Sequence, residues 1–425
     1  MFLLYNLFLT ITALFWVPWM LFRTRKRKEH PIWDERFGNY PLTPRKDRKR
    51  VWIHAVSVGE VVASTPLLRE LRTLLPDFEI VLSVTTSSGH QTAREQAPKL
   101  YDHLVYFPID VARFQLAAMQ RVQPAVVAIV ETELWMNFLW AAKTFGAETM
   151  LVNGRIGDRS FPRAMKIRFF YKALLEHMDR CIMQSERDAE RIRALGAKEV
   201  EVLGNVKFDQ ALEGLNADPK EWKRKLKLAS DKPVLVIGST RGEEEERFVL
   251  DALKIIGFDR LAVIHAPRHL ERVPELAAHV RELTGGVALR SKQQAGPYMI
   301  LDTYGELSDV YSVADFVIIG GGFAPLGGQN LLQPLAHGKP VLYGPHMENF
   351  RDVAGAAREA GATRIVATPA ELATALKDLL TNPEEARKMG EAARQLVQAN
   401  VGATRRYAVQ IAEAAKMRAA ALGKM

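Results

Sequence analysis

The feature that most constrains the fold is an alternation of short apolar segments with amphipathic ones, which runs twice along the 425-residue chain. Strands that alternate with helices form parallel sheets covered by helices on both faces. The first run of predicted strands is Val51–Val56, Glu79–Val84, Leu104–Pro108, Ala125–Val130, Thr149–Asn153, Arg180–Met183 and Glu199–Leu203. The second run is Pro233–Ile237, Arg260–His265, Gly286–Leu289, Met299–Leu301, Phe316–Gly320 and Pro340–Tyr343. The pattern therefore predicts an α/β protein with two Rossmann-like domains.

The domain boundaries follow from composition. We expect an N-terminal domain over residues 51–211, a polar linker over 212–232, a C-terminal domain over 233–398 and a C-terminal helix over 399–425. A chain of this length is too long for one ordinary core, which agrees with two domains. Two Rossmann-like domains facing a cleft, followed by a helical tail, are the layout of a glycosyltransferase of the GT-B type.

The N-terminus carries an uncharged stretch, Phe2–Phe22, which is rich in Leu, Phe and Trp. It is long enough to cross a hydrocarbon core of about 30 Å. We predict a membrane anchor over residues 1–22 and a basic juxtamembrane segment over 23–50, with everything after the anchor in the cytoplasm. A helix that lies flat in the membrane interface is the alternative.

Charge and cysteine content exclude several classes of protein. The net charge is +9, but residues 1–50 hold eleven Lys or Arg and four Asp or Glu, so the rest is nearly balanced and no nucleic-acid partner is expected. Cys181 is the single cysteine, which rules out a disulfide within the chain. No Asp-x-Asp sequence and no paired metal-binding histidines occur, so we expect no metal site.

Paired acids follow the predicted strand Ala125–Val130. Glu131 and Glu133 lie two residues apart, so both can face one side, and Trp135 comes directly after them. Ligands of open α/β sheets bind beyond the carboxyl ends of the strands. The alternative is a solvated loop with a packed Trp135.

Glu60 stands at a strand–loop–helix junction, in the first turn of a helix predicted to run to Leu75. We expect the helix dipole to hold its carboxylate ionised, so that it can accept a proton from an acceptor hydroxyl. The alternative is an ordinary acid at a helix start.

Candidate anion-binding segments lie mainly in the second half. Gly320–Gly322 joins a strand to a helix that we expect to begin near Asn330, and such a turn can cradle phosphate or merely satisfy backbone geometry. Gly238–Glu243 is a second cradle or a helix cap. Arg268 follows a strand and can bind phosphate or form a surface ion pair. Lys207, at the end of the first half, can reach the interdomain cleft.

Together these motifs resemble the 3-deoxy-D-manno-octulosonic acid (Kdo) transferases of lipopolysaccharide synthesis. The resemblance covers nearly the whole chain and is carried above all by the Glu131–Asn137 run and by the Ser57–Glu60 turn. Further matching segments are Glu35–Gly38, Thr85–Gly89, Val152–Asn153, Gly204–Phe208, Pro267–His269 and Gly327–Pro334.

The resemblance implies a GT-B fold, CMP-Kdo as donor substrate with no further cofactor, a lipid A precursor as acceptor, and inversion without a metal. It also implies a place at the anionic inner face of the cell inner membrane. Glu60 would be the general base, and Glu131 and Lys207 would stabilise charge at the reacting centre. The implied CMP-binding residues are Pro267, Arg268, Tyr304, Gly305, Glu306, Asn330, Leu331, Leu332 and Gln333.

Departures from the family pattern leave alternatives open. Gln329 stands where the family carries His, Gln333 where it carries Glu, Arg241 where it carries His, and Met136 where it carries Pro. Gln333 can accept a hydrogen bond without charge assistance. A UDP-sugar transferase acting on another lipid, or a non-catalytic membrane-tethered glycolipid-binding protein, therefore remains an alternative.

One more segment suits an amphiphilic acceptor. Between residues 159 and 172 cationic side chains alternate with aromatic ones. The cations can bind the phosphates of an acceptor, and the aromatic side chains can contact its acyl chains or the membrane interface. The alternative is an amphipathic helix with a solvated basic face. The cations are Arg159, Arg163, Lys166, Arg168 and Lys172, and the aromatic residues are Phe161, Phe169, Phe170 and Tyr171.

Overall fold

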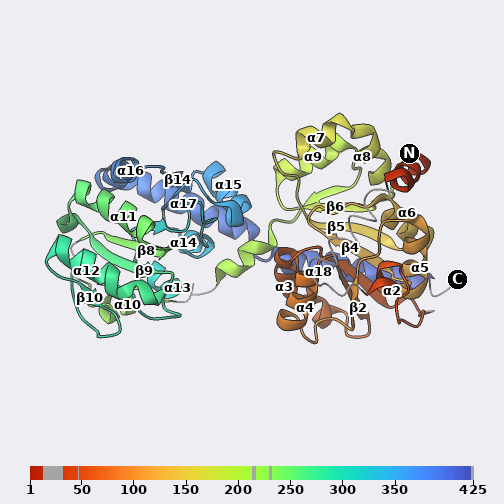
Figure 1. Cartoon of the computed structure of the whole chain (residues 1–425), viewed down its shortest axis with the longest axis horizontal. Coiled ribbons are helices and arrows are strands. Elements are labelled where there is room, and N and C mark those ends of the chain that lie inside the picture. The colour runs from red at the N-terminus through yellow and green to blue at the C-terminus, as the bar shows by residue number, and fades with distance from the viewer. Residues whose placement is uncertain (13–31, 46, 213–216, 229–231, 423–425) are drawn as a thin grey trace. The chain divides into compact units, whose positions relative to one another are not determined.

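The computed structural model describes residues 1–12, 32–45, 47–212, 217–228 and 232–422. The chain forms two compact units (Figure 1). The first comprises Met1–Val206 and Gly402–Met425, and the second comprises Lys207–Val401. The second unit thus begins a few residues before the linker predicted over 212–232.

The first unit contains a seven-stranded, fully parallel sheet in the order β3-β2-β1-β4-β5-β6-β7. All seven predicted strands are confirmed, with ends that shift by at most two residues. Their bounds are β1 (Arg50–His54), β2 (Glu79–Val84), β3 (His103–Tyr106), β4 (Val126–Val130), β5 (Glu148–Gly154), β6 (Arg180–Met183) and β7 (Val200–Val202).

Helices cover both faces of this sheet, and each face has its own apolar core. In β1, Val51 and Ile53 face one core while Trp52 faces the other, because successive strand residues point to opposite sides. The helices are α2 (Trp33–Arg36), α3 (Val58–Leu74), α4 (Ser87–Gln96), α5 (Ala112–Val122), α6 (Met136–Thr144), α7 (Phe161–Lys166), α8 (Arg168–Leu175), α9 (Glu186–Leu195) and α18 (Ala403–Leu422).

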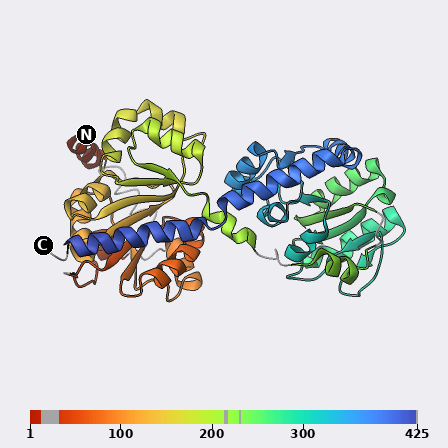
Figure 2. The ribbon, with the colours of Figure 1, turned by 180° about the vertical axis from the view of Figure 1, so that it is seen from behind.

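The C-terminal helix α18 belongs to the first unit and lies against α3, as Figure 2 shows from behind. Tyr407 and Ile411 are fully buried in the core between the sheet and these helices. The Tyr407 hydroxyl also donates to the carbonyl oxygens of Met183, at 3.1 Å, and Gly204, at 2.9 Å. The final helix therefore completes a core that begins with β1, far away in the sequence.

The second unit also contains a seven-stranded parallel sheet, in the order β10-β11-β9-β8-β12-β13-β14. The strands are β8 (Val234–Thr240), β9 (Ala262–Pro267), β10 (Ala288–Leu289), β11 (Tyr298–Ile300), β12 (Phe316–Ile319), β13 (Val341–Tyr343) and β14 (Thr363–Ile365). Six were predicted; β14 was missed because it is short, half-exposed and contains a polar Thr363 and Arg364. The helices are α10 (Pro219–Lys225), α11 (Glu243–Ile256), α12 (Val273–Thr284), α13 (Leu307–Val310), α14 (Leu332–Ala336), α15 (Arg351–Glu359), α16 (Pro369–Thr381) and α17 (Pro383–Asn400).

The segment predicted as a polar linker contains helix α10. Its Trp222 is only 7% exposed and packs in the core of the second unit, and the Asp218 side chain caps the helix by accepting from the Lys220 amide. The abundant Lys and Glu residues suggested a linker because they lie on the exposed face of this short helix.

The N-terminal helix is described over residues 2–12, while residues 13–22 of the predicted anchor and the basic run 23–28 lie outside the described residues. Within the described ranges, none of the helices has the length and apolar character that crossing a membrane requires. One side of helix 2–12 contacts the first unit. The Tyr5 hydroxyl donates to Asp110 at 2.8 Å, and the Asn6 and Asn137 side chains exchange hydrogen bonds of 2.8 and 3.0 Å.

Candidate active site

The candidate site of the first unit lies where its strand order reverses. β1 lies beside β4, and later strands extend outward from this pair in opposite directions. Such a switch point opens a crevice beyond the carboxyl ends of the two strands. Glu60 follows β1, whereas Glu131 and Glu133 follow β4. The fold therefore brings Glu60 close to Glu131 and Glu133, which come about seventy residues later in the sequence.

Glu60 is half-buried in the first turn of α3. Its Oε2 accepts a 2.7 Å hydrogen bond from the Val56 amide, and its Oε1 accepts one of 3.1 Å from the Ser57 hydroxyl. Burial raises the pKa of Glu60 to about 7, and the negative charges of Glu131 and Glu133 raise it further. The two hydrogen bonds act in the opposite direction and lower this pKa. The helix dipole alone therefore does not set the charge of Glu60, because burial and the neighbouring acids raise its pKa.

Glu131 has an unusual backbone conformation, whereas Glu133 has a raised pKa. Glu131 adopts a left-handed backbone with φ of +64°, which is uncommon for a residue other than glycine. Its amide donates to Val152 O in the neighbouring strand at 3.0 Å, and its carbonyl oxygen accepts from the Arg155 amide at 3.3 Å. Burial raises the pKa of Glu133. Strained backbone held in place by a neighbouring strand is typical of functional loops.

Asp110 binds the start of α6, the helix that follows this acidic loop, and was not predicted from the sequence. It is buried, and it accepts hydrogen bonds from the amides of Asn137, at 3.3 Å, and Phe138, at 3.0 Å, which begin α6 directly after the loop. Burial raises the pKa of Asp110 to about 6, and the Tyr5 hydroxyl and these amides oppose the rise. No local sequence signal marks Asp110, because the helix that it caps begins 26 residues later.

Lys207 belongs to the second unit, whereas Glu60 and Glu131 belong to the first. It is the second residue of a 3₁₀ helix, Val206–Leu212, and its Nζ lies 3.5 Å from the Asp352 carboxylate at the start of α15. The preceding segment is tied to the first unit by the Asn153 Oδ1, which accepts from the Val206 amide at 3.3 Å. Lys207 therefore stands at the point where the chain passes from one unit to the other.

In the second unit the strand order reverses between β8 and β12. The loop after β12, residues 320–328, is called the glycine loop below. Its amide groups do not form an open phosphate cradle: those of Gly321 and Phe323 donate to the carboxylate of Glu245 at 2.6 and 2.9 Å. The phosphate role suggested for these amides is therefore not supported, because a side chain of α11 occupies them.

The segment Gly238–Glu243 joins β8 to the N-terminus of α11. Gly242 precedes α11, and the Arg241 amide donates to Glu245 Oε2 at 2.8 Å. The Arg241 side chain donates from Nη1 to the Leu326 carbonyl oxygen at 3.1 Å, so it also holds the glycine loop. Glu245 was missed, although a glutamate in a helix's first turn is a recognisable capping signal.

Arg268 is exposed directly after β9, with its amide donating to Thr240 O at 2.9 Å, and Pro267 is the last residue of the strand. Tyr304 is 77% exposed and Gly305 has a φ of +85°. Burial alone would raise the pKa of Glu306, but hydrogen bonds from Arg290, at 2.7 and 3.1 Å, and from Thr303 lower it. Glu306 is thus an ion-paired carboxylate, and Arg268 is the exposed cation of this group.

The predicted residues Asn330 to Gln333 surround the start of α14, which begins at Leu332. The Asn330 Oδ1 accepts from the amide of Leu332, the first residue of this short helix, at 2.9 Å. Leu331 and Leu332 are almost fully buried in the core, so their side chains pack inside the protein and do not line a surface. Gln333 is half-buried and follows them on the helix.

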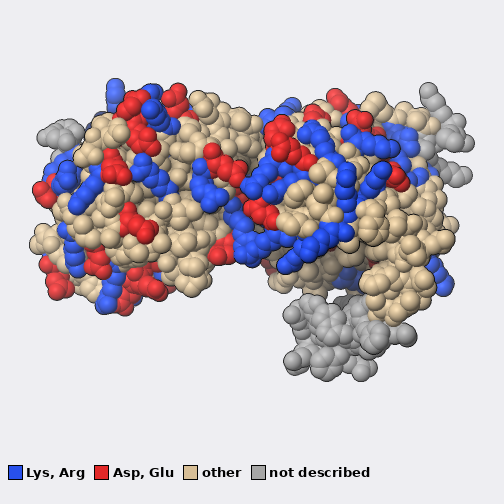
Figure 3. All heavy atoms as spheres, turned by 90° about the horizontal axis from the view of Figure 1, so that it is seen from above, with Lys and Arg blue, Asp and Glu red and all other residues tan. Residues whose placement is uncertain are grey.

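The cations predicted to meet an acceptor are exposed on and beside α7 and α8, on a side of the first unit where Lys and Arg gather in Figure 3. The aromatic residues divide into two groups. Phe161, Phe170 and Tyr171 pack against the core, whereas Phe169 is 63% exposed. The Phe170 ring lies 5.5 Å from that of Tyr5, so helix 2–12 adjoins α8.

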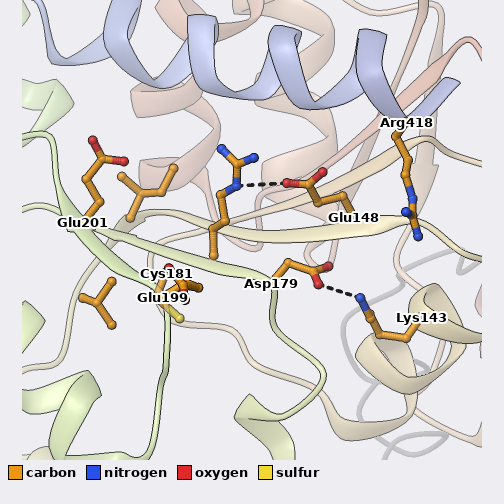
Figure 4. A pocket seen from close by; sticks show the side chains of 10 residues that line it. Lys143, Glu148, Asp179, Cys181, Glu199, Glu201 and Arg418 are labelled. Atoms are coloured by element: carbon orange, nitrogen blue, oxygen red, sulfur yellow. Dashed lines mark hydrogen bonds and ion pairs between the residues drawn. The ribbon is translucent and has the colours of Figure 1, made fainter. Parts of the chain in front are cut away.

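A pocket of about 510 Å³ lies at the opposite, amino-terminal edge of the first sheet (Figure 4). Its charges are largely paired: Lys143 with Asp179 at 2.6 Å, and Arg180 with Glu148 at 3.0 Å. Because this pocket lies at the amino-terminal edge of the sheet, it is separate from the acids, which follow the carboxyl ends of β1 and β4. Among the described residues, no group of three or more His, Cys, Asp or Glu side chains is arranged to hold a metal ion.

Comparisons with known proteins agree with this geometry. A model of the 3-deoxy-D-manno-octulosonic-acid transferase (kdotransferase) family matches residues 32–210. A 3-deoxy-D-manno-octulosonic acid transferase of Bordetella pertussis is 33% identical over 415 residues, which cover 91% of this chain and 94% of that protein. A bifunctional glycosyltransferase/methyltransferase of Fusobacterium nucleatum subsp. nucleatum is 33% identical over 83% of this chain, which spans 55% of that protein.

The crystal structure of MurG from Acinetobacter baumannii is similar in fold. It is 16% identical, with a TM-score of 0.56 over 86% of this chain and 99% of that chain. This similarity supports the GT-B arrangement of two parallel α/β sheets. With the Bordetella relative matching almost from end to end, the chain belongs to the Kdo transferase family of glycosyltransferases.

Proposed function

We propose that the protein transfers Kdo from CMP-Kdo to a hydroxyl group of the lipid A precursor lipid IVA, with inversion and without a metal ion. Family membership supports the sugar that is transferred. The observation that carries the mechanism is Glu60, a half-buried carboxyl at the switch point with a pKa of about 7. A carboxylate with a pKa near the working pH is well matched to general-base catalysis.

In the proposed reaction the Glu60 carboxylate accepts the proton of the acceptor hydroxyl. The hydroxyl oxygen forms a bond to the anomeric carbon from the face opposite the nucleotide. The bond from that carbon to the phosphate oxygen breaks, and its electron pair leaves with CMP. Glu131 faces the positive charge that develops on the sugar, and Lys207 the negative charge on the leaving group.

The second unit supplies the proposed contacts to the donor. The exposed guanidinium of Arg268 is suited to the phosphate of CMP, with Pro267 beside it. The exposed Tyr304 ring, next to Gly305 and Glu306, offers surface for the nucleoside. The remaining contacts are assigned to Asn330 and Gln333, with the buried Leu331 and Leu332 holding these two residues in place. Because Gln333 is uncharged, we expect its bond to a ribose hydroxyl to be weaker than that of a glutamate.

We further propose that the first unit docks on the anionic cytoplasmic face of the inner membrane. On helix 2–12 the side chains of Leu3, Leu7 and Phe8 are exposed, on a helix whose other side is hydrogen-bonded to the protein. Phe169 extends this apolar surface on the adjoining α8, and the exposed cations around it suit lipid phosphates. The same surface would present a membrane-embedded acceptor to Glu60.

The catalytic proposal is tested by comparing wild type, Glu60→Gln and Glu70→Gln in transfer from CMP-Kdo to lipid IVA, with products identified by mass. Glu70 lies on the same helix α3 and forms a surface ion pair of 3.1 Å with Arg405. We expect a loss of roughly 10²–10⁴-fold for Glu60→Gln and near wild-type activity for the control. Full activity of a folded Glu60→Gln enzyme would refute the proposed base, and inhibition by UDP in place of CMP would refute the donor.

Membrane docking is tested by flotation with vesicles that contain anionic lipids. Phe8→Glu places a charge on the exposed apolar face of helix 2–12, whereas Thr10→Glu places one on an exposed polar residue of the same helix. We expect Phe8→Glu to weaken flotation strongly and Thr10→Glu to weaken it less. Equal flotation of both variants and wild type would contradict this surface.

A further inference from the structure

Glu245 is an unusual acid in the second unit because its side chain is fully buried beneath the glycine loop. Within the described residues, its hydrogen bonds come from backbone amides alone. Oε2 accepts from Arg241 at 2.8 Å and Gly321 at 2.6 Å, and Oε1 accepts from Phe323 at 2.9 Å and Ala324 at 3.4 Å. Both oxygens of this buried carboxyl group therefore have partners in the surrounding backbone.

The arrangement matches the way proteins bind anions. Successive backbone amides of a glycine-rich turn form a concave nest that takes up a phosphate or another anion. Glu245 reaches this nest from the first turn of α11, where the helix dipole also favours a negative charge. The loop amides therefore bind an anion that belongs to the protein itself.

The glycine loop is closely packed around this carboxylate. Gly321 has a φ of +75°, and its carbonyl oxygen accepts from the Gly328 amide at 2.6 Å, which closes the loop. A Cβ on Gly320 would lie 2.5 Å from Thr240 Cα, so the loop contacts the end of β8 without space for a side chain. The loop leads directly into the segment Gln329–Gln333.

We propose that Glu245 is a positioning residue for the donor: by filling the anion nest from within, it presets the glycine loop so that Gln329–Gln333 is ordered before the nucleotide arrives. The inference rests on the proposed function, which assigns that segment to CMP binding. The four backbone amides need two acceptor oxygens, and each oxygen of Glu245 accepts from two of them. Glutamine has one acceptor oxygen, and an NH₂ group in place of the other. In Glu245→Gln the NH₂ group would therefore face two backbone N–H groups, so that hydrogen-bond donors would face donors.

The test compares Glu245→Gln with Glu244→Gln, an exposed neighbour on the same turn of α11. Hydrogen exchange of the loop amides needs no substrate, and we expect exchange of Gly321 and Phe323 to accelerate at least tenfold in Glu245→Gln alone. We also expect CMP affinity to fall at least tenfold and KM for CMP-Kdo to rise equally, with kcat within about threefold of wild type. Loss of kcat alone, or thermal destabilisation with unchanged CMP affinity, would overturn a positioning role.

If the glutamine variant does not fold, the same measurements are made on Glu245→Asp. It keeps the charge but is one methylene shorter, so it should lose part of the amide contacts and show smaller changes in the same direction. Unchanged loop exchange or CMP affinity in the folded aspartate variant would then overturn the inference. Wild-type CMP binding and transfer are measured first: their absence would refute the proposed function, whereas normal binding by both Glu245 variants would refute this inference alone.

Discussion

Replacing Glu60 by glutamine should stabilise the protein at alkaline pH while it strongly reduces transfer. The folded-state pKa of Glu60 is about 7, whereas its ordinary value is 4.5. A carboxyl whose pKa is raised on folding contributes its full stability below the unfolded value, and that contribution is lost as the pH rises through the folded value. At pH 8.5 the wild type must hold a buried charge that the glutamine variant lacks.

The magnitude follows from the gap between 4.5 and about 7, at about 1.4 kcal/mol per pH unit. Ionisation of Glu60 then costs the fold about 3 kcal/mol at high pH, most of it between pH 5 and 8.5. Glutamine can keep the bond from the Val56 amide through its carbonyl oxygen. We therefore expect the free energy of unfolding of Glu60→Gln, relative to wild type, to increase by about 2–3 kcal/mol between pH 5 and pH 8.5.

The assay is urea denaturation of both proteins at the two pH values, followed by tryptophan fluorescence, to which the buried Trp52 of the first unit contributes. Glu70→Gln is the matched control and should show the same pH dependence as wild type. Parallel stability profiles for wild type and Glu60→Gln would refute the reasoning, since they would mean that Glu60 has an ordinary pKa in the folded state.

The same pKa predicts the pH dependence of catalysis. A general base must be deprotonated, so kcat/KM should fall below an apparent pKa of about 7. Glu133→Gln removes a negative charge that raises the pKa of Glu60, so the acidic limb should move to lower pH, provided that the variant retains activity. A limb that stays in place, or moves to higher pH, would contradict the coupling between these two acids.

Three further predictions concern structure. Tyr5→Phe removes the 2.8 Å bond to buried Asp110, so helix 2–12 should lose protection from hydrogen exchange; unchanged protection would contradict its docking. Gly320→Ala sets a Cβ 2.5 Å from Thr240 Cα and should cost about 1–3 kcal/mol in urea denaturation, whereas no loss would disprove the close approach. Burial raises the pKa of the Cys181 thiol to about 12, so iodoacetamide should label it at pH 8 after denaturation but not before.

The amino-acid sequence alone was enough to predict the alternation of strands and helices. Buried parallel strands are apolar on both faces, so they stand out as short uninterrupted runs. Thirteen of the fourteen strands in the described part of the chain were found in this way. The short, half-exposed β14 and the helix α10 lacked this signal. Glu60, Glu131 and Arg268 were recognisable as candidates because each stands where a strand ends, and parallel strands bring such ends to one edge.

Tertiary structure decided what these side chains experience. The pKa of Glu60 depends on its burial and on acids from another strand, which no local pattern encodes. The amides of the glycine loop are occupied by Glu245, about seventy-five residues earlier in the chain, and α6 is capped by Asp110 from a preceding loop. Local sequence determines which backbone a segment prefers, whereas the charge state and partners of a buried group depend on everything that folding brings around it.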